Sequence, residues 1–207
     1  MAGDGPGDAD TVAGRVAYQG APGAFSHEAC LDLRPWDEAV AFDTFAQALD
    51  AVRSGDCGCA LIPVENSIIG AVEPAAGLVA AAGMAVVAEV WRPIRLALMA
   101  IPGARLSDIR TVESHPIALR QCTATLASLG VRAVEGFDTA GAARTVAEAG
   151  DPSRAAAAPV RSAEVYGLSI LRNDLQDSST ASSRPTACIT AFMAFDTPAE
   201  ASGSLQS

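Results

Sequence analysis

Near its carboxyl end the chain carries a run of hydroxyl side chains followed by a single arginine. In the stretch QDSSTASSRPTACIT, residues 176–190, five of the six positions from Ser178 to Ser183 bear a hydroxyl group, and Arg184 and Pro185 come next. A guanidinium binds a carboxylate through two parallel hydrogen bonds, and hydroxyl groups donate or accept further ones. The composition by itself is typical of a surface loop, whereas the residue types also suit the edge of an anion site. Which interpretation holds depends on what else in the chain converges on Arg184.

Three other stretches place polar residues where a strand is expected to end and a helix to begin. They are YQGAPGAFSHEA, PVENSIIG and VESHPIAL, and they contain Ala24, Phe25, Ser26, His27, Glu65, Asn66, Ser67, Ser114 and His115. In the third stretch Ser114 is a suitable N-cap, and Pro116 suits a first helical turn, where no amide donor is needed. Each junction would expose backbone N–H groups at the positive end of a helix dipole, which favours a carboxylate or phosphate. Ordinary helix caps would give the same pattern, so both interpretations stay open.

The elements that must position these residues follow an alternating pattern. Short apolar runs alternate with helical segments, which predicts an α/β fold with mostly parallel strands. Strands are predicted at 15–20, 59–64, 84–90, 96–101, 110–114, 132–137, 155–159 and 187–195. Helices are predicted at 26–33, 44–55, 67–83, 115–130, 139–150 and 159–167. Junctions at the carboxyl ends of strands line the ligand crevice in open α/β sheets. The stretch Arg-Pro-Ile-Arg at 92–95 is the candidate hinge between two halves of comparable size.

Charge and composition exclude several classes of function. The net charge is −10 without any cluster of Lys or Arg, which argues against nucleic acid and against an anionic membrane as partners. No apolar run approaches the roughly 18 residues of a membrane span. The N-terminus lacks the basic and apolar segments of a signal peptide, so we expect a cytoplasmic location and, for the five cysteines, reduced thiols. Residues 1–14 and 196–207 are expected to be disordered tails.

Neither cysteine nor histidine forms a recognisable catalytic or metal-binding motif. Cys57 and Cys59 have the wrong spacing for a zinc knuckle, and no histidine lies near them in the sequence. His27 and His115 are the only histidines, and no G-x-S-x-G motif supplies a nucleophile for a Ser–His–Asp triad. The glycines of GAPGAF match neither a P-loop nor a dinucleotide fingerprint. We therefore expect no metal and no organic cofactor.

Taken in order, these stretches resemble the signature blocks of prephenate dehydratases. YQGAPGAFSHEA, IPVENSIIGAVE, ESHPIALRQC and AAAAPVRSAEVYGLSIL followed by LQD carry the resemblance, which spans about 18–190. It implies two α/β lobes like those of type II periplasmic binding proteins, with the dicarboxylate prephenate held in the cleft between them. The implied catalytic domain is 15–195, with lobe 1 at about 15–93 plus 185–195 and lobe 2 at about 94–184. The resemblance makes Ala24, Phe25, Ser26, His27, Glu65, Ser67, Ser114, His115 and Arg184 substrate-binding residues, and Asn66, Ser183 and Arg184 catalytic residues.

One block departs from the family pattern. After the Gln-Asp pair the family has Asn-x-Thr-Arg-Phe, whose threonine is the supposed acid for the departing ring hydroxyl, whereas this chain has Ala181-Ser182-Ser183-Arg184-Pro185. Only the arginine is kept, although Ser183 still offers a hydroxyl, and Pro185 removes a backbone donor. The regulatory ACT domain that often follows the catalytic part is not expected, because the chain ends at residue 207. These departures resemble the prephenate decarboxylases of secondary metabolism, including antibiotic biosynthesis.

The resemblance therefore implies a lyase that removes CO₂ from prephenate and keeps the ring hydroxyl, giving a dihydro-4-hydroxyphenylpyruvate. One alternative is an ordinary prephenate dehydratase, which releases phenylpyruvate. An alternative of another class is a non-catalytic protein that binds a small anion in the same cleft. Product analysis separates the first two, and binding without turnover would indicate the third. A homodimer is left open.

Overall fold

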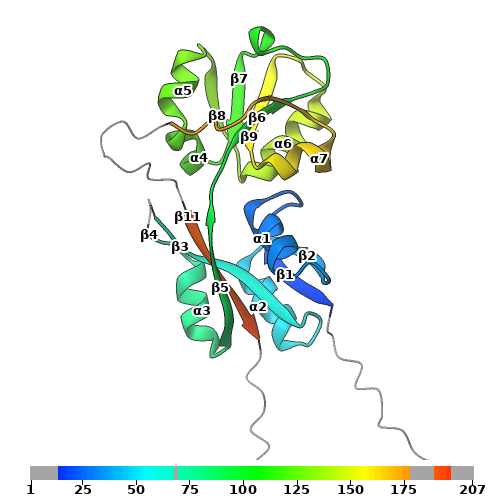
Figure 1. The fold of residues 1–207 in the computed structure, drawn as a ribbon, viewed down its shortest axis with the longest axis vertical. Helices are drawn as coiled ribbons and strands as arrows, with labels where there is room; N and C mark the ends of the chain where they lie inside the picture. The colour runs from blue at the N-terminus through cyan, green and yellow to red at the C-terminus, as the bar shows by residue number, and fades with distance from the viewer. Residues whose placement is uncertain (1–13, 68–69, 178–188, 197–207) are drawn as a thin grey trace, which may run out of the picture.

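The chain forms two α/β lobes arranged one above the other along the long axis of the molecule (Figure 1). The computed structural model describes residues 14–67, 70–177 and 189–196. The two predicted tails, apart from Gly14 and Asp196, and the block that contains Ser183 and Arg184 lie outside the described residues. None of the helices in the described part is long and apolar enough to cross a membrane.

Lobe 1 is built on a six-stranded sheet with the order β2-β1-β3-β11-β5, and β4 pairs with β3 at its end. Its strands are β1 (Arg15–Gln19), β2 (Glu38–Phe42), β3 (Cys59–Asn66), β4 (Gly70–Ala71), β5 (Ala85–Pro93) and β11 (Ile189–Asp196). Its helices are α1 (Phe25–Leu33), α2 (Phe45–Arg53) and α3 (Ala75–Ala82).

Strands β1 and β3 of lobe 1 are covered on both faces. Val16 and Leu61 pack with Cys30 of α1 on one face, whereas Ala17 and Ile62 pack against α2 and α3 on the other. Successive side chains of a strand point to opposite faces, so a strand covered on both sides is apolar at every position. This explains why β1 and β3 appear in the sequence as continuous apolar runs.

Lobe 2 is built on a five-stranded sheet with the order β10-β6-β9-β7-β8. Its strands are β6 (Ala97–Ala100), β7 (Thr111–Ser114), β8 (Arg132–Glu135), β9 (Arg154–Ala158) and β10 (Ser169–Arg172). Its helices are α4 (Pro116–Gln121), α5 (Thr123–Ser128), α6 (Thr139–Ala149) and α7 (Val160–Tyr166), with a 3₁₀ turn η1 (Leu106–Asp108). The central strand β9 consists of Arg154 and four alanines, and the alanines are fully buried. Its small side chains allow helices to pack closely on both faces of the sheet.

The chain passes between the two lobes twice. The first passage runs from the end of β5 at Pro93 to the start of β6 at Ala97, so the predicted hinge at 92–95 lies where the chain changes sheets. The second passage leads from β10 back to β11, which inserts between β3 and β5 and runs antiparallel to both. Lobe 1 is therefore completed only by the last described strand of the chain.

Three local predictions were wrong. The sheets are mixed rather than mostly parallel, because β11, β6 and β10 pair antiparallel with their neighbours. The helix predicted at 67–83 begins only at Ala75: Gly70 has a φ of 75°, outside the helical region, and Pro74 is the N-cap of α3. The helix predicted at 115–130 is split into α4 and α5 at Cys122. The short strands β2, β4 and β10 were not predicted.

Candidate functional site between the lobes

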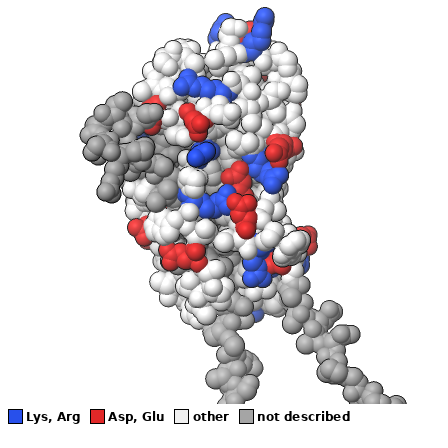
Figure 2. Space-filling model, viewed as in Figure 1, with Lys and Arg blue, Asp and Glu red and all other residues white. Residues whose placement is uncertain are grey.

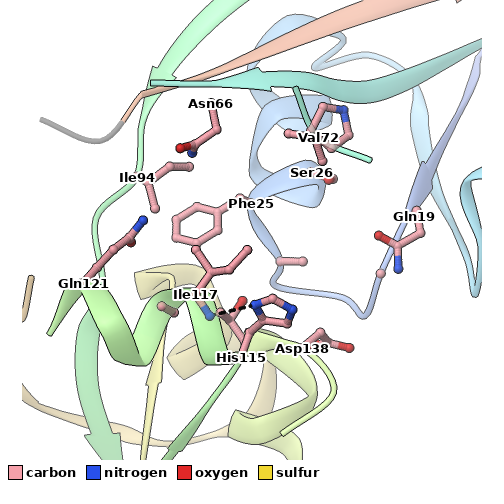
Figure 3. Close-up of a pocket in the computed structure, with 15 residues that line it drawn as sticks. Gln19, Phe25, Ser26, Asn66, Val72, Ile94, His115, Ile117, Gln121 and Asp138 are labelled. Carbon is pink, nitrogen blue, oxygen red and sulfur yellow. Dashed lines mark hydrogen bonds between the residues drawn. The ribbon is translucent and has the colours of Figure 1, made fainter. Parts of the chain in front are cut away.

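A cavity of about 250 Å³ lies between the lobes and is lined by both of them. The lining residues are Gln19, Gly20, Ala24, Phe25, Ser26, Pro63, Asn66, Val72, Ile94, His115, Ile117, Ala118, Gln121, Asp138 and Thr139. Figure 3 shows Phe25 of lobe 1 close to Ile117 and Gln121 of lobe 2 across this space. Five of the predicted site residues, Ala24, Phe25, Ser26, Asn66 and His115, thus meet at one cavity.

Part of the lobe 1 wall of the cavity is formed by the β1–α1 loop, residues 20–24, and the first turn of α1. Helix α1 starts at Phe25, and its N-cap Ala24 offers no side-chain acceptor. The first backbone N–H groups of a helix have no partner within the helix and lie at the positive end of its dipole. This turn can therefore accept an anionic group of a ligand. Ser26, which is almost fully buried, adds a hydroxyl at the same place.

His27 has a different position from its neighbours. Its Nδ1 accepts a hydrogen bond from the backbone N–H of Gly23 at 2.9 Å, and its ring stacks on Tyr18 with a centroid distance of 5.2 Å. Burial, reinforced by the nearby charge of Arg161, lowers the pKa of His27 below its ordinary value. His27 therefore holds the β1–α1 loop through the N–H of Gly23, and it does not belong to the described lining of the cavity.

The second predicted junction has another structure. Strand β3 continues to Asn66 and is followed by β4, so no helix N-terminus exists at Ser67. Asn66 is buried and lines the cavity. Glu65 and Ser67 are exposed and do not belong to the described lining residues. This follows from the alternation of side chains along a strand, which separates Asn66 from both of its neighbours.

At the third junction, His115 rather than Ser114 caps the helix. The Nδ1 of His115 accepts a hydrogen bond from the backbone N–H of Ile117 at 3.2 Å, and Pro116 occupies the first turn as predicted. Ser114 is fully buried, and its hydroxyl donates to the carbonyl oxygen of Ala157 at 2.6 Å. The prediction of Ser114 as an N-cap was therefore wrong: its side chain ties β7 to β9.

The protonation state of His115 follows from this contact. Because Nδ1 accepts a hydrogen bond, the neutral ring carries its proton on Nε2 and can donate it to a ligand. Burial lowers the pKa of His115, and the carboxylate of Asp138 opposes this shift without cancelling it. The lowered pKa favours the neutral ring near pH 7, in which the Nε2–H is available as a donor at the cavity.

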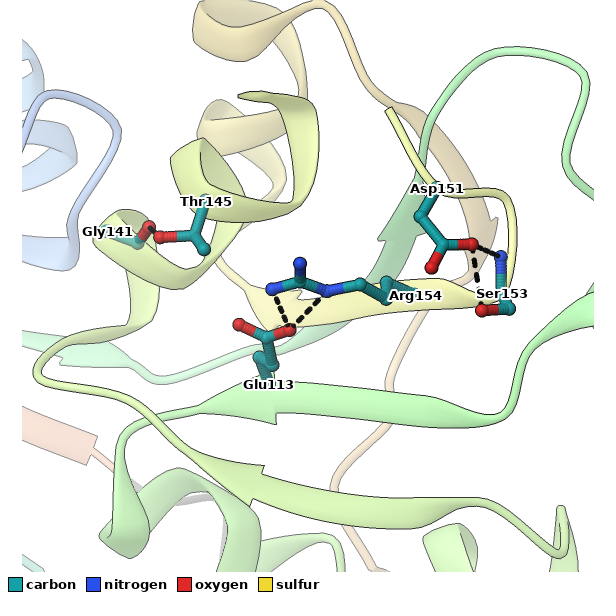
Figure 4. A network of polar contacts seen from close by, with 6 residues as sticks. All are labelled: Glu113, Gly141, Thr145, Asp151, Ser153 and Arg154. Atoms are coloured by element: carbon teal, nitrogen blue, oxygen red, sulfur yellow. Dashed lines mark hydrogen bonds and ion pairs between the residues drawn. The ribbon is translucent and has the colours of Figure 1, made fainter. Parts of the chain in front are cut away.

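An ion pair links β9 to β7, the strand that ends directly before His115. Arg154 of β9 donates from Nε and Nη2 to the same carboxylate oxygen of Glu113 on β7, at 2.8 and 2.5 Å (Figure 4). Glu113 is buried, whereas the side chain of Arg154 is 31% exposed, so this pair is only partly removed from water. Such a pair contributes little net stability but holds its partners in one geometry. The pair thereby helps to fix the position of the end of β7, directly before His115 at the cavity.

Sequence reasoning missed four polar lining residues: Gln19, Gln121, Asp138 and Thr139. Asp138 is the N-cap of α6 and accepts a hydrogen bond from the backbone N–H of Gly141. The aspartate before the helical run TAGAARTVAEAG was a recognisable cap signal. Nothing in the local pattern of Gln19 or Gln121 indicates that it faces the other lobe.

The described residues on either side of the segment 178–188 each contact a residue of the cavity lining. The backbone N–H of Asp177 donates to the carbonyl oxygen of Gln121 at 2.8 Å, and its carboxylate accepts from the N–H groups of Ala124 and Thr125 at 2.8 and 2.7 Å. On the other side, Thr190 of β11 pairs with Asn66.

The described lining of the cavity contains one carboxylate, Asp138, and no lysine or arginine. Figure 2 shows basic and acidic groups interleaved on the visible face rather than gathered in one patch. Among the described residues, no group of three His, Cys, Asp or Glu is arranged to hold a metal ion. Along the described lining of the cavity, the groups that could bind an anion are therefore backbone N–H groups and neutral side chains.

Two α/β lobes with a cavity between them, lined by both apolar and polar side chains, define a two-lobed protein with a candidate binding site between its lobes. The model of the prephenate dehydratase family matches residues 16–186, and the chain belongs to this family. A solved prephenate dehydratase from Arthrobacter aurescens, in complex with L-Phe, superposes with a TM-score of 0.79 at 27% identity, covering 89% of this chain and 61% of that chain. A structure described as GqqA, a novel type of quorum quenching acylase, gives a TM-score of 0.80 at 37% identity, covering 89% and 65%.

Curated relatives show the same relationship. A bifunctional N-acyl-homoserine lactone acylase/prephenate dehydratase from Komagataeibacter europaeus is 39% identical over 78% of this chain and 58% of its own length. Arogenate dehydratase 1 from Petunia hybrida is 40% identical over 80% of this chain and 40% of its own length. The chain thus spans about half the length of the curated relatives that it matches. The predicted family and the two-lobed α/β fold are confirmed.

Proposed function

We propose that this protein is a lyase that decarboxylates prephenate and retains the ring hydroxyl. The observation that carries the proposal is the block Ala181-Ser182-Ser183-Arg184-Pro185, which replaces the Asn-x-Thr-Arg-Phe pattern of the dehydratases. The match to the family extends over 16–186 and includes this block, so the change concerns one short stretch in an otherwise family-like chain. A loss of the acid alters the outcome of the reaction without altering the substrate.

The cavity suits a compact substrate with polar ends. Its volume of about 250 Å³ lies just below the range of about 300–1,000 Å³ that is typical of small-molecule sites. Phe25 and Ile117 supply apolar surface for a ring, while the first turn of α1 and the Nε2–H of His115 supply donors for carboxylates. We assign the positive charge that a dianion needs to Arg184, which follows the anchored Asp177 in the sequence.

The proposed reaction starts with loss of the ring carboxylate as CO₂, which leaves its electron pair in the diene. In a dehydratase these electrons expel the ring hydroxyl, which leaves as water after protonation by an acid. With no acid placed at that oxygen, the carbon–oxygen bond is kept and one ring carbon takes up the proton instead. Both routes consume one proton and release one CO₂, so their overall balance differs only by one water. Because the product is not aromatic, we assign it to secondary metabolism.

A second candidate is prephenate dehydratase itself. Relatives that are 38–40% identical are named as arogenate or prephenate dehydratases, which directly favours this reaction. Ser183 also retains a hydroxyl group at the position of the family threonine. In this case the product is phenylpyruvate, and the altered block would lower the rate without changing the outcome.

Product identification decides between these reactions. Purified protein is incubated with prephenate, and the products are separated and assigned by NMR together with ultraviolet absorption. A non-aromatic product that keeps the alcohol supports the proposal, and enzyme-dependent phenylpyruvate as the main product replaces it by the second candidate. Because prephenate also decomposes in acid, a control without enzyme runs in parallel. Calorimetric binding of prephenate without any turnover would reduce the function to binding of a small anion.

A further inference from the structure

The β1–α1 loop belongs to lobe 1, yet it is bonded to helix α7 of lobe 2. The hydroxyl of Ser162 donates to the carbonyl oxygen of Gly23 at 3.0 Å. The phenolic hydroxyl of Tyr166, one turn further along α7, donates to the carbonyl oxygen of Pro22 at 2.8 Å. These residues are more than a hundred positions apart in the sequence, and both contacts cross the junction between the lobes.

A third hydrogen bond extends this contact to helix α1. The backbone N–H of Arg161, in the first turn of α7, donates to the carboxylate of Glu28 at 3.3 Å. Burial raises the pKa of Glu28, and this hydrogen bond and the charges of Arg92 and Arg161 oppose the shift. Figure 1 shows α1 directly beneath α7 at the junction of the lobes. The two helices and the loop form one continuous interlobe contact.

Gly23 packs so closely against α7 that a side chain at this position would clash with Ser162. A Cβ atom at this position would lie 2.9 Å from the Cα of Ser162, and its φ of 90° is one that other residues rarely adopt. Its N–H is bound by His27 of lobe 1 and its carbonyl oxygen by Ser162 of lobe 2. Ser162 is completely buried, so water does not compete for the bond.

The loop that α7 holds is also one wall of the cavity. Gly20 and Ala24, at its two ends, line the cavity together with Phe25 and Ser26 directly after it. The opposite wall contains His115 of lobe 2. Displacement of the loop from α7 would therefore move the first turn of α1 relative to the imidazole of His115. Misplacement of binding groups by about 1 Å can lower a rate roughly a hundredfold.

We propose that Ser162 and Tyr166 are positioning residues that hold the β1–α1 loop against lobe 2 and so set the spacing between the two walls of the cavity. They act through the loop and do not line the cavity among the described residues. The kinetic part of this inference rests on the proposed function, whereas the effect on the loop does not.

The test uses Ser162→Ala, Tyr166→Phe and the double variant, each of which removes hydroxyl groups with little change of volume. Ser128→Ala is the matched control: its hydroxyl donates to the carbonyl oxygen of Thr125 at 2.7 Å, within lobe 2 and away from the junction. Hydrogen–deuterium exchange of the backbone amides at 20–26 is measured in the protein without ligand. We expect each single variant to raise these exchange rates roughly two- to tenfold, because that factor corresponds to the loss of one net hydrogen bond. The control should leave them unchanged.

Steady-state kinetics with prephenate give the second readout. The double variant should lose at least about tenfold in kcat/KM, while its melting temperature falls no further than the sum for the single variants. Faster exchange without any turnover in the unmodified protein would overturn the proposed function and leave the loop contact established. Exchange rates and kinetics equal to those of Ser128→Ala would overturn the positioning role.

Discussion

The backbone N–H of Asp177 donates a hydrogen bond to the carbonyl oxygen of Gln121, with 2.8 Å between nitrogen and oxygen. Gln121 lines the cavity, so the chain enters residues 178–188 from the edge of the site. After this segment, Thr190 pairs with Asn66, which lines the cavity as well. Arg184 therefore lies, in the sequence, between two residues that contact the cavity lining.

Replacement of Arg184 by alanine should raise the free-energy barrier that corresponds to kcat/KM by about 2–5 kcal/mol. The reason is that a carboxylate of the bound substrate loses its charged partner. Arg184→Lys keeps the charge but loses the forked geometry, so it should still lower kcat/KM clearly. The matched control is Arg132→Ala, which removes an exposed arginine of β8. Circular dichroism should be the same for all three variants. If Arg184→Ala behaves like the control, this arginine belongs to an ordinary surface loop.

The altered acid block should determine whether the ring hydroxyl leaves. Ser183→Thr combined with Pro185→Phe restores two family residues on either side of Arg184. We expect the double variant to release some phenylpyruvate, because a threonine hydroxyl is again available to protonate the departing oxygen. The product mixture is measured by chromatography against authentic phenylpyruvate. A variant that is only inactive would show that the block is not sufficient to change the outcome.

Ser114 should affect stability rather than substrate binding. Its buried hydroxyl bonds to the carbonyl oxygen of Ala157, so Ser114→Ala should lower the free energy of unfolding by about 0.5–1.5 kcal/mol. The KM for prephenate should not change, since the hydroxyl is directed into lobe 2. Urea denaturation and steady-state kinetics separate the two effects, and Ser107→Ala on the exposed 3₁₀ turn serves as the control. A raised KM with an unchanged free energy of unfolding would instead support the predicted role of Ser114 in substrate binding.

The two histidines should make the protein less stable in mild acid. Burial lowers the pKa of both His27 and His115 in the fold, whereas the unfolded chain has the ordinary value of about 6.5. As the pH falls below this value, the unfolded state binds protons first, and the free energy of unfolding decreases until the folded pKa values are passed. Protonation of His27 on Nδ1 also removes the acceptor for the N–H of Gly23, next to the charge of Arg161.

Melting temperatures between about pH 8 and about pH 5 test this prediction, since histidine is the side chain whose ordinary pKa falls in that window. The double variant His27→Gln/His115→Gln contains no histidine and should show a flatter profile. A profile as steep as that of the unmodified protein would assign the acid effect to carboxylates instead.

Metal chelation should leave turnover unchanged. The unsaturated ring of prephenate accepts the electrons of the departing carboxylate, so the reaction needs no further electron sink. The rate with prephenate is measured before and after treatment with EDTA and dialysis. Loss of activity that is restored by a divalent metal would contradict this mechanism.

The sequence by itself determined the local elements and the family. Strands β1 and β3 and helices α2 and α6 could be predicted because apolar periodicity, caps and terminal glycines are local signals. The ordered blocks around Phe25, Asn66 and His115 indicated the prephenate dehydratase family for the same reason, since each block is a short contiguous stretch. The cap by Asp138 was also visible in the sequence, although its position at the cavity was not.

Only the tertiary structure decided which of these residues share one space. Ser114 and His115 are neighbours in the sequence. The hydroxyl of Ser114 donates to the carbonyl oxygen of Ala157 inside lobe 2, whereas the side chain of His115 lines the cavity. The antiparallel insertion of β11 and the contact of Gly23 with Ser162 depend on partners far away along the chain. No local propensity encodes such pairings, because they are selected by burial and by hydrogen bonds that exist only once both lobes have formed.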